Sequence, residues 1–238
     1  MRLAVLSDVH GNRLALEAVL DDIARQGCDL TVNLGDMVSG PLEPGRCADL
    51  LIDADFPTVR GNHDRWLAER DKLDTIDRHV RPQLAARHLD WFAALPGTLT
   101  VGADIFVCHG TPTSDTTPWL DAWWTGRDTT LPDEAAVSAE ADGLDFPLLL
   151  CGHTHLARAV RLRDGRLIVN PGAVGLQTVH GLPDARYAVV ERRNGQWSTT
   201  FRAVPYDHDA AARQAEANGF AHWGPALSTG WAPPAGLF

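Results

Sequence analysis

The sequence predicts an α/β protein built as a four-layer α/β/β/α sandwich, in which helices flank two mixed sheets. Two observations support this. The first 60 residues alternate short apolar runs with amphipathic segments, the pattern of parallel βαβ units. Residues 98–203 contain many short strand-like runs joined by tight turns, which indicates antiparallel hairpins and a second sheet. With 238 residues and 45% hydrophobic content, the chain is long enough to bury the cores of such a sandwich.

The first half of the chain opens with a buried strand at residues 2–6. A helix is expected at 13–26, because Leu16, Val19 and Ile23 recur on one face, and Gly27 then ends it. The other elements expected in this half are strands at 29–34 and 57–60 and helices at 44–54, 65–72 and 82–94.

The second half is predicted to be mostly strands. Asp164-Gly165 and Asn194-Gly195 are strong two-residue hairpin turns between such strands. We expect one domain over residues 1–238, with a Trp-rich segment at 111–133 as a cap and a C-terminal extension at 207–238. The strands are expected at 98–101, 104–108, 147–151, 157–163, 166–169, 186–193 and 196–203.

Composition narrows the class of protein. The net charge of −10 disfavours a sequence-independent grip on nucleic acid, which needs clustered Lys and Arg. The negative net charge does not exclude a small anionic substrate if bound cations supply local positive charge. The four cysteines form no CxxC pair, and no signal-peptide core or membrane-length apolar run is present. We therefore expect a cytoplasmic protein with free thiols and no membrane partner, and the oligomeric state is left open.

Five short polar motifs each follow an apolar run. Since carboxyl ends of parallel strands share one edge of a sheet, these motifs are expected to converge there. Aspartates, an asparagine amide and imidazoles are the donors that suit a pair of divalent cations. In extended geometry Asp8 and His10, two residues apart, would point to the same side. The motifs are Asp8-Val9-His10, Gly35-Asp36, Gly61-Asn62-His63-Asp64, His109-Gly110 and Gly152-His153-Thr154-His155.

Each motif taken alone has an ordinary structural explanation. Gly-Asp is common turn chemistry, and an isolated histidine is more often hydrogen-bonded in a core than bound to a metal. The joint occurrence of all five at predicted strand ends favours the metal interpretation. His63, next to Asn62, is then the natural general acid for a leaving group. The tryptophans at 119, 123 and 124 are more often packing residues than a stacking platform. Asn170-Pro171-Gly172-Ala173 is most simply a tight turn, and the alternative that it holds a polar group near the site stays open.

With these motifs the chain resembles the calcineurin-like metallophosphoesterases over roughly residues 1–203, in particular their compact bacterial and archaeal phosphodiesterase-like branch. The resemblance implies the four-layer sandwich and two metal ions, chosen from manganese, iron, zinc, nickel and cobalt. It implies one metal held by Asp8, His10, Asp36 and His155, and another held by Asp36, Asn62, His109 and His153. His63 matches the catalytic histidine, and Asp64 matches the acidic residue that follows it.

The chain departs from the phosphoprotein phosphatase branch, whose motif runs Gly-Asp-x-Val-Asp-Arg-Gly. Ser39 and Gly40 stand where that branch has an aspartate that orients the catalytic histidine and an arginine that binds phosphate. Arg60 and Arg65 flank the Gly-Asn-His-Asp motif and are candidate substitutes, although a structural role for Arg60 is equally consistent with the sequence.

The expected activity is hydrolysis of a phosphate mono- or diester of a small metabolite, nucleotide or dinucleoside polyphosphate. A hydroxide shared by the two cations would attack phosphorus while His63 protonates the leaving oxygen. Two alternatives stay open, a nuclease and a non-catalytic metal-binding scaffold of the same fold.

Overall fold

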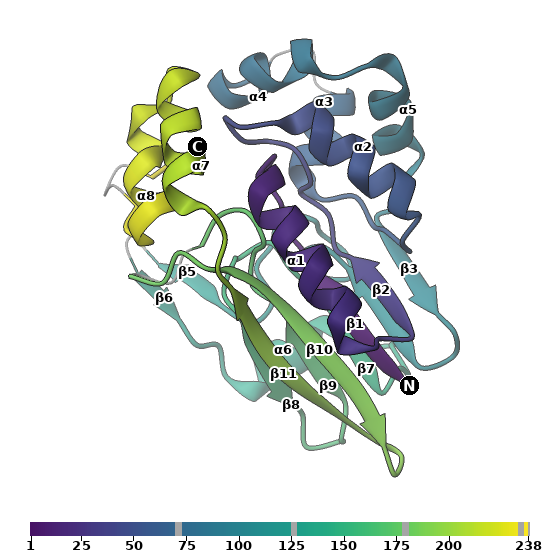
Figure 1. The fold of residues 1–238 in the computed structure, drawn as a ribbon. Coiled ribbons are helices and arrows are strands. Elements are labelled where there is room, and N and C mark those ends of the chain that lie inside the picture. Colours follow the sequence, from purple (N-terminus) through teal and green to yellow (C-terminus); the bar gives the residue numbers. More distant parts are fainter. Residues whose placement is uncertain (70–72, 125–127, 178–180, 233–235, 238) are drawn as a thin grey trace.

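The computed structural model describes residues 1–69, 73–124, 128–177, 181–232 and 236–237 and contains two mixed sheets (Figure 1). The first sheet has the strand order β11-β10-β1-β2. β1 runs parallel to β2 and antiparallel to β10. These strands span Arg2–Leu6 (β1), Leu30–Asn33 (β2), Ala185–Arg193 (β10) and Gln196–Val204 (β11).

The second sheet has the order β3-β4-β7-β9-β8. Its three central strands are parallel, and its two edge strands pair antiparallel through hairpins. A separate antiparallel pair is formed by β5 (Ala122–Trp124) and β6 (Asp128–Thr130). The strands of the second sheet span Thr98–Val101 (β3), Ile105–Cys108 (β4), Leu148–Leu150 (β7), Arg158–Arg161 (β8) and Leu167–Asn170 (β9).

Helices cover the outer faces of both sheets. In Figure 1, α1 and α2 lie in front of the first sheet, and α6 lies behind the second. None of the described helices has the length and apolarity to cross a membrane. The α-helices span Arg13–Gln26 (α1), Pro44–Ala54 (α2), Asn62–Glu69 (α3), Thr75–Val80 (α4), Ala86–Ala94 (α5), Glu134–Glu140 (α6), His208–Ala217 (α7) and Gly224–Thr229 (α8), with 3₁₀ turns at Arg81–Gln83 and Ala221–Trp223.

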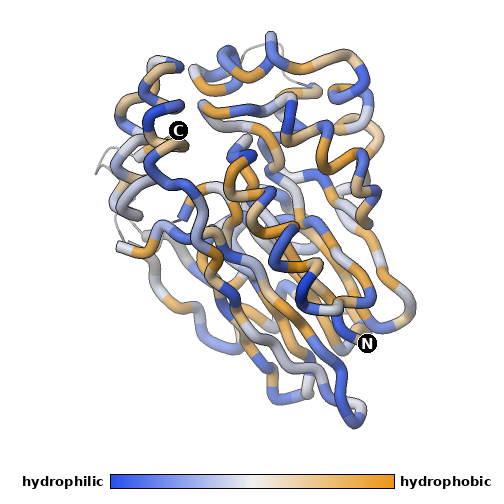
Figure 2. Tube along the Cα trace, in the orientation of Figure 1, coloured by the Kyte–Doolittle hydropathy of each residue, from blue (hydrophilic) through white to orange (hydrophobic). Residues whose placement is uncertain are grey.

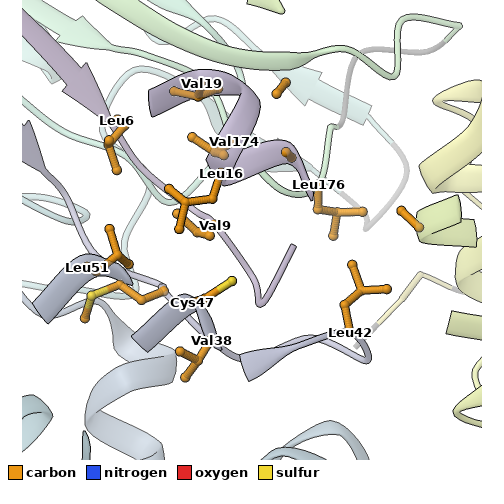
Figure 3. Close-up of a cluster of buried hydrophobic side chains, with 14 of the residues drawn as sticks. Leu6, Val9, Leu16, Val19, Val38, Leu42, Cys47, Leu51, Val174 and Leu176 are labelled. Atoms are coloured by element: carbon orange, nitrogen blue, oxygen red, sulfur yellow. The ribbon is translucent and has the colours of Figure 1, made fainter. Parts of the chain in front are cut away.

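Three apolar clusters fill the three interfaces between the layers. Successive side chains of a strand point to opposite faces, so Ala4 and Leu6 of β1 join the helix-facing cluster, whereas Leu3 and Val5 join the cluster between the sheets. Figure 3 shows the first of these around Leu6 and the helix α1, and Figure 2 shows the apolar and polar stripes of α1. The third cluster lies between the second sheet and α6. The predicted four-layer fold class is confirmed.

The structure corrects three details of the expected elements. Residues 57–60 form no strand, since Thr58 makes only an isolated bridge with Asn33. The helix expected from residue 65 already begins at Asn62, so the Gly-Asn-His-Asp motif is a helix start instead of a turn. Helices α4 and α6 were not predicted; both are short, and their few apolar residues give a weak periodic signal.

The predicted cap at 111–133 and the predicted C-terminal extension at 207–238 each contribute a buried tryptophan. Trp119 is buried and donates its indole N–H to the carbonyl of Val137 at 2.9 Å, which agrees with a packing role. The side chains of Trp123 and Trp124 lie outside the described residues, so the cap over 111–133 stays a prediction. The C-terminal segment from residue 207 places Trp223, fully buried, in the helix-facing cluster.

One buried carboxylate joins α1 to the neighbouring strands β10 and β11 of the first sheet. Asp22 is 7% exposed and accepts two hydrogen bonds from Arg202, at 2.5 and 3.1 Å, and one from the Tyr187 hydroxyl at 2.7 Å. The hydrogen bond from Arg202 lowers the pKa of Asp22, the opposing effect of burial being smaller, and Tyr187 lowers it further. The charged form of Asp22 therefore stabilises the fold.

We expect Asp22→Asn to lower the free energy of unfolding at pH 7 by about 1.5–3 kcal/mol, the usual worth of hydrogen bonds to a charged group. Because the folded-state pKa is depressed, this stabilisation is present above the unfolded pKa of about 3.9 and is lost as the pH falls through the folded value. Urea unfolding of the unaltered protein and of Asp22→Asn, at pH 7 and near pH 3, measures the difference in their free energies of unfolding. If this difference is the same at both pH values, the charged form of Asp22 does not stabilise the fold.

Candidate metal centre

The predicted site residues meet where strands from both sheets end. Asp8 follows β1, and its backbone N–H donates to Gly35, which follows β2, at 2.9 Å. His109 follows β4 and accepts from the N–H of Gly152, after β7, at 2.6 Å. The two sheets are linked here, because the N–H of His153 donates to Oδ2 of Asp8 at 3.2 Å.

One group of potential metal donors consists of Asp8, His10 and His155, all buried. The Nε2 atoms of the two imidazoles lie 3.0 Å apart. Oδ1 of Asp8 lies 3.4 Å from Nε2 of His155 and 3.9 Å from Nε2 of His10. Among the described residues, no hydrogen bond satisfies this buried Oδ1. A carboxylate oxygen and two ring nitrogens facing one point suit a divalent cation.

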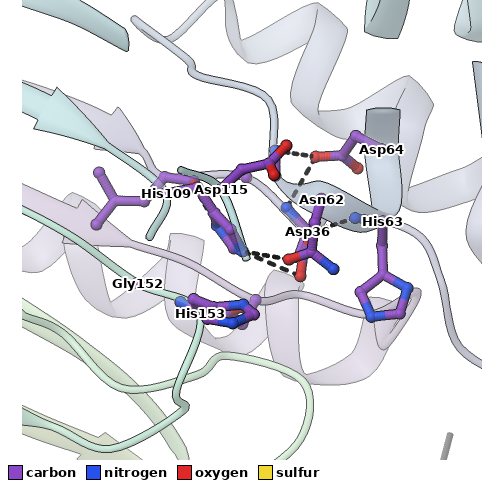
Figure 4. A network of polar contacts seen from close by, with 12 residues as sticks. Asp36, Asn62, His63, Asp64, His109, Asp115, Gly152 and His153 are labelled. Atoms are coloured by element: carbon purple, nitrogen blue, oxygen red, sulfur yellow. Dashed lines mark hydrogen bonds and ion pairs between the residues drawn. The ribbon is translucent and has the colours of Figure 1, made fainter. Parts of the chain in front are cut away.

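A second group consists of Asp36, His109 and His153. Nε2 of His109 lies 3.1 Å from Oδ2 of Asp36. Figure 4 shows these side chains converging with Asn62. The structure thus divides the predicted donors as the family resemblance implies, except that Asp36 belongs to one group only. Its shared role between two cations stays a prediction.

The amide of Asn62 lies among lone pairs. One of its terminal atoms is 3.0 Å from Nδ1 of His153, 3.2 Å from Nε2 of His109 and 3.1 Å from the carbonyl oxygen of Asp115. The carbonyl oxygen of Asp115 and Nδ1 of His153 are hydrogen-bond acceptors, so the NH₂ group suits this position in the absence of a cation. A cation among the same acceptors would instead favour the amide oxygen, and this donor set fits one.

Backbone carbonyls hold three of the imidazoles. Nδ1 of His10 donates to Ser39 at 2.7 Å, and Nδ1 of His109 donates to Leu34 at 2.7 Å. Nε2 of His153 donates to Thr116 at 3.0 Å. Since a carbonyl can only accept, each ring nitrogen so engaged carries a proton, which leaves the other nitrogen of each ring to face the donor groups. At metal sites, a hydrogen bond to the ring nitrogen that does not face the metal fixes the tautomer and the orientation of the imidazole.

Positive backbone φ angles concentrate on the candidate donors. The expectation that Asp8 and His10 are extended is wrong, since both have left-handed conformations. Elsewhere in the described chain only Asp55, which ends α2, and Asn194, in the hairpin turn, share this geometry among non-glycine residues. Such conformations cost on the order of 1–3 kcal/mol each and persist where surrounding structure enforces them. The φ values are 56° for Asp8, 47° for His10, 54° for Asp36, 71° for His153 and 59° for His155.

The shifted pKa values of the site residues show that its buried carboxylates attract positive charge. Burial raises the pKa of Asp36, but the nearby imidazoles, His109 first, outweigh it and hold that pKa well below its usual range. Burial lowers the pKa of His109, but Asp36 and Asp8 raise it to about 10. A bound cation would take the place of the His109 proton. Burial, reinforced by a neighbouring imidazole, lowers the pKa of His10 to about 3 and that of His153 to about 4, so both stay neutral donors.

His63 lies on the first turn of α3, next to both groups. Its backbone N–H donates to Oδ1 of Asp36 at 2.9 Å, and its ring centroid is 5.5 Å from that of His10. The ring also packs edge-on against Trp66, with centroids 4.9 Å apart. Sequence reasoning missed Trp66, although its spacing of three residues from His63 on a helix would have indicated the contact.

Asp64 turns away from the imidazoles. Its Oδ2 accepts the N–H groups of Asp36 at 2.8 Å and Gly61 at 2.9 Å, and its Oδ1 accepts that of Met37 at 3.0 Å. Burial raises the pKa of Asp64 to about 7, with Asp36 adding to the effect. These contacts give Asp64 a positioning role beside Asp36. The catalytic role expected for it stays a prediction.

Two networks support the site; the first was not predicted, and the second agrees with the alternative role considered for the Asn170 turn. The carboxylate of Asp77, on α4, accepts from the Ser39 hydroxyl at 2.8 Å, so it braces the residue whose carbonyl holds His10. Asn170 donates to the carbonyl of Gly152 at 2.6 Å and to the Thr154 hydroxyl at 3.1 Å. The tight turn at Asn170 therefore holds the Gly-His-Thr-His loop in place. Both networks join residues distant in sequence, which no local motif reveals.

The two arginines considered as phosphate ligands are already paired. Arg60 contacts Glu69 at 2.9 Å, and Arg65 binds Asp115 through two hydrogen bonds. Cys108 and Cys151, beside the motif histidines, are buried strand-end residues, and burial raises the pKa of both thiols. A thiolate ligand is disfavoured there.

Comparisons with known proteins agree with this geometry. The calcineurin-like phosphoesterase superfamily domain matches residues 1–195. The crystal structure of a metallophosphoesterase from Sphaerobacter thermophilus is 30% identical, with a TM-score of 0.73 over 92% of this chain and 94% of that one. The uncharacterized protein MJ0912 of Methanocaldococcus jannaschii is 24% identical over 93% of this chain and 94% of its own length. The chain therefore belongs to the calcineurin-like phosphoesterase superfamily.

Proposed function

We propose that this protein is a metal-dependent phosphoric ester hydrolase acting on a small phosphorylated metabolite or nucleotide. The observation that carries the proposal is the pair of Asp/His donor groups, Asp8–His10–His155 and Asp36–His109–His153, with His63 next to both. Bound there, divalent cations would supply Lewis-acid polarisation of the phosphoryl group and activation of water. Asn62 would complete the second group.

In this proposal His63 protonates the leaving oxygen. It is 8% exposed, and its backbone N–H is tied to Asp36, so the start of α3 and the second donor group hold a fixed relation. The T-shaped contact with Trp66 restricts the imidazole ring. A general acid must lie within reach of the departing group, and a histidine on this turn is placed for that task.

The two alternative functions have less support. A non-catalytic scaffold has no need of a histidine beside both donor groups. A nuclease needs a basic surface for the phosphate backbone, and the net charge of −10 does not favour one. Neither monoester nor diester is favoured over the other, because no cationic side chain described at the site is unpaired and placed to select between them.

Elemental analysis of the purified protein, followed by assays of p-nitrophenyl phosphate and bis(p-nitrophenyl) phosphate with added Mn²⁺, tests the activity. We expect about two bound divalent cations per chain and hydrolysis of at least one ester. A metal-loaded protein that hydrolyses neither these esters nor a panel of nucleotides contradicts the hydrolase proposal.

His63→Ala is expected to keep both cations and to lower kcat by about 10²–10⁴-fold, the usual contribution of a general acid. Asp36→Asn should lose metal as well as activity. The matched control is His222→Ala, which removes an exposed histidine of the C-terminal segment. Metal content and kcat measured together separate the two roles. Full activity in His63→Ala would disprove the general-acid assignment.

The backbone around Asp36 leaves no room for added side chains. Gly61 packs so closely that a Cβ there would lie 2.1 Å from Oδ1 of Asp36. We expect Gly61→Ala to displace this carboxylate and to weaken cation binding at the second group while the protein stays folded. Gly97→Ala is the control, because a Cβ there meets nothing within 4 Å. Calorimetric titration with Mn²⁺ measures the effect, and unchanged affinity in Gly61→Ala would show that Asp36 is not a ligand.

A further inference from the structure

One loop supports two donors of the second group. The segment from Thr111 to Thr116, here called the 111–116 loop, leaves the end of β4 after His109. The carbonyl oxygen of Thr116 accepts from His153 at 3.0 Å, and that of Asp115 lies 3.1 Å from the Asn62 amide. By contrast, the carbonyls that hold His10 and His109 belong to Ser39 and Leu34, in the segment after β2. The position of the 111–116 loop therefore bears on Asn62 and His153 in particular.

The 111–116 loop is shaped by its own hydrogen bonds and borders a cavity. Within it, the N–H of Thr111 donates to the carbonyl of Ser114 at 2.7 Å, and the N–H of Thr116 donates to the Ser114 hydroxyl at 3.3 Å. These bonds give the loop a defined shape. The loop also borders a cavity of about 460 Å³ shared with Arg60 and Thr98, and among the described residues that line this cavity neither Asn62 nor His153 is found. His109 and both members of the Arg65–Asp115 pair line this cavity as well.

Arg65 ties the loop to α3. Its Nε donates to Oδ2 of Asp115 at 2.6 Å, and its Nη2 donates to Oδ1 at 2.8 Å. A bidentate pair of this kind restricts orientation as well as distance. The side chains are 30% and 20% exposed, so solvent screens the pair only in part. Arg65 follows Asn62 by three residues on the same helix. The pair thus joins the helix that carries Asn62 to the loop that holds His153.

We propose that the Arg65–Asp115 pair is a positioning device that sets the cation affinity of the Asp36–His109–His153 group without touching cation or substrate. The inference rests on the proposed metal binding and is independent of the hydrolysis step. In this pair Nε and Nη2 of Arg65 are both engaged with the Asp115 carboxylate. Loss of contacts that orient metal ligands typically weakens metal affinity by 10- to 100-fold.

The test is calorimetric titration of the metal-free protein with Mn²⁺. His10→Ala and His109→Ala identify which binding step belongs to which group. We expect Arg65→Gln and Asp115→Asn each to weaken the second group by about 10- to 100-fold and to leave the first group unchanged. The double variant should lose no more than either single variant, because both remove one interaction. Arg65→Lys should give a cation affinity at the second group between those of the unaltered protein and Arg65→Gln, since a lysine cannot bind both carboxylate oxygens at once.

The matched control pair is Arg163 and Glu134, which contact each other at 2.9 Å outside the site. Arg163→Gln and Glu134→Gln should change neither binding step. Equal weakening of both groups in the Asp115 variant, accompanied by a lower Tm, would show a general structural role and overturn the inference. So would unchanged affinity at both groups, or additive losses in the double variant. If both cations bind as expected but no ester is hydrolysed, the proposed function fails while this inference stands.

Discussion

The Asp36 carboxylate joins the parts of the molecule that meet at the site. Its Oδ1 accepts the N–H of His63 at 2.9 Å, and its Oδ2 lies 3.1 Å from His109. Its own backbone N–H is held by Asp64 at 2.8 Å. One side chain thus links the end of β2 in the first sheet, the start of the helix α3 and the end of β4 in the second sheet. The relation of the catalytic candidate to the second donor group depends on these contacts.

This arrangement is costly for the fold. Asp8 and Asp36 are buried carboxylates, and five of the candidate donors have left-handed backbone conformations. Removing a carboxylate from water is unfavourable and must be offset by its imidazole partners, and each strained conformation adds to the cost. The three apolar clusters between the layers offset that cost, because they fix the strand ends from which the donors project. A cation bound among the donors would also relieve the repulsion between their facing lone pairs.

The regular elements were largely predictable. The strand at Arg2–Leu6 and the helix at Arg13–Gln26 have the predicted bounds, since apolar periodicity and a terminal glycine are local signals. The predicted strand at 57–60 was wrong, because a short β-like run needs a partner along its whole length. The expected geometry of Asp8 and His10 was also wrong. A spacing of two residues says which side chains are neighbours, but the turn after β1 is imposed by contacts with Gly35 and Asp36.

The sequence by itself determined the fold class, the family and the identity of the residues that gather at the strand ends, because residue type and order are local properties. Only the tertiary structure decided which ring nitrogen each histidine presents, and that Asp64 faces backbone amides. It also revealed the ties from Asp77 to Ser39 and from Arg65 to Asp115. Both ties join segments that are tens of residues apart in the sequence, and only the packing of the folded chain brings such segments within hydrogen-bond distance.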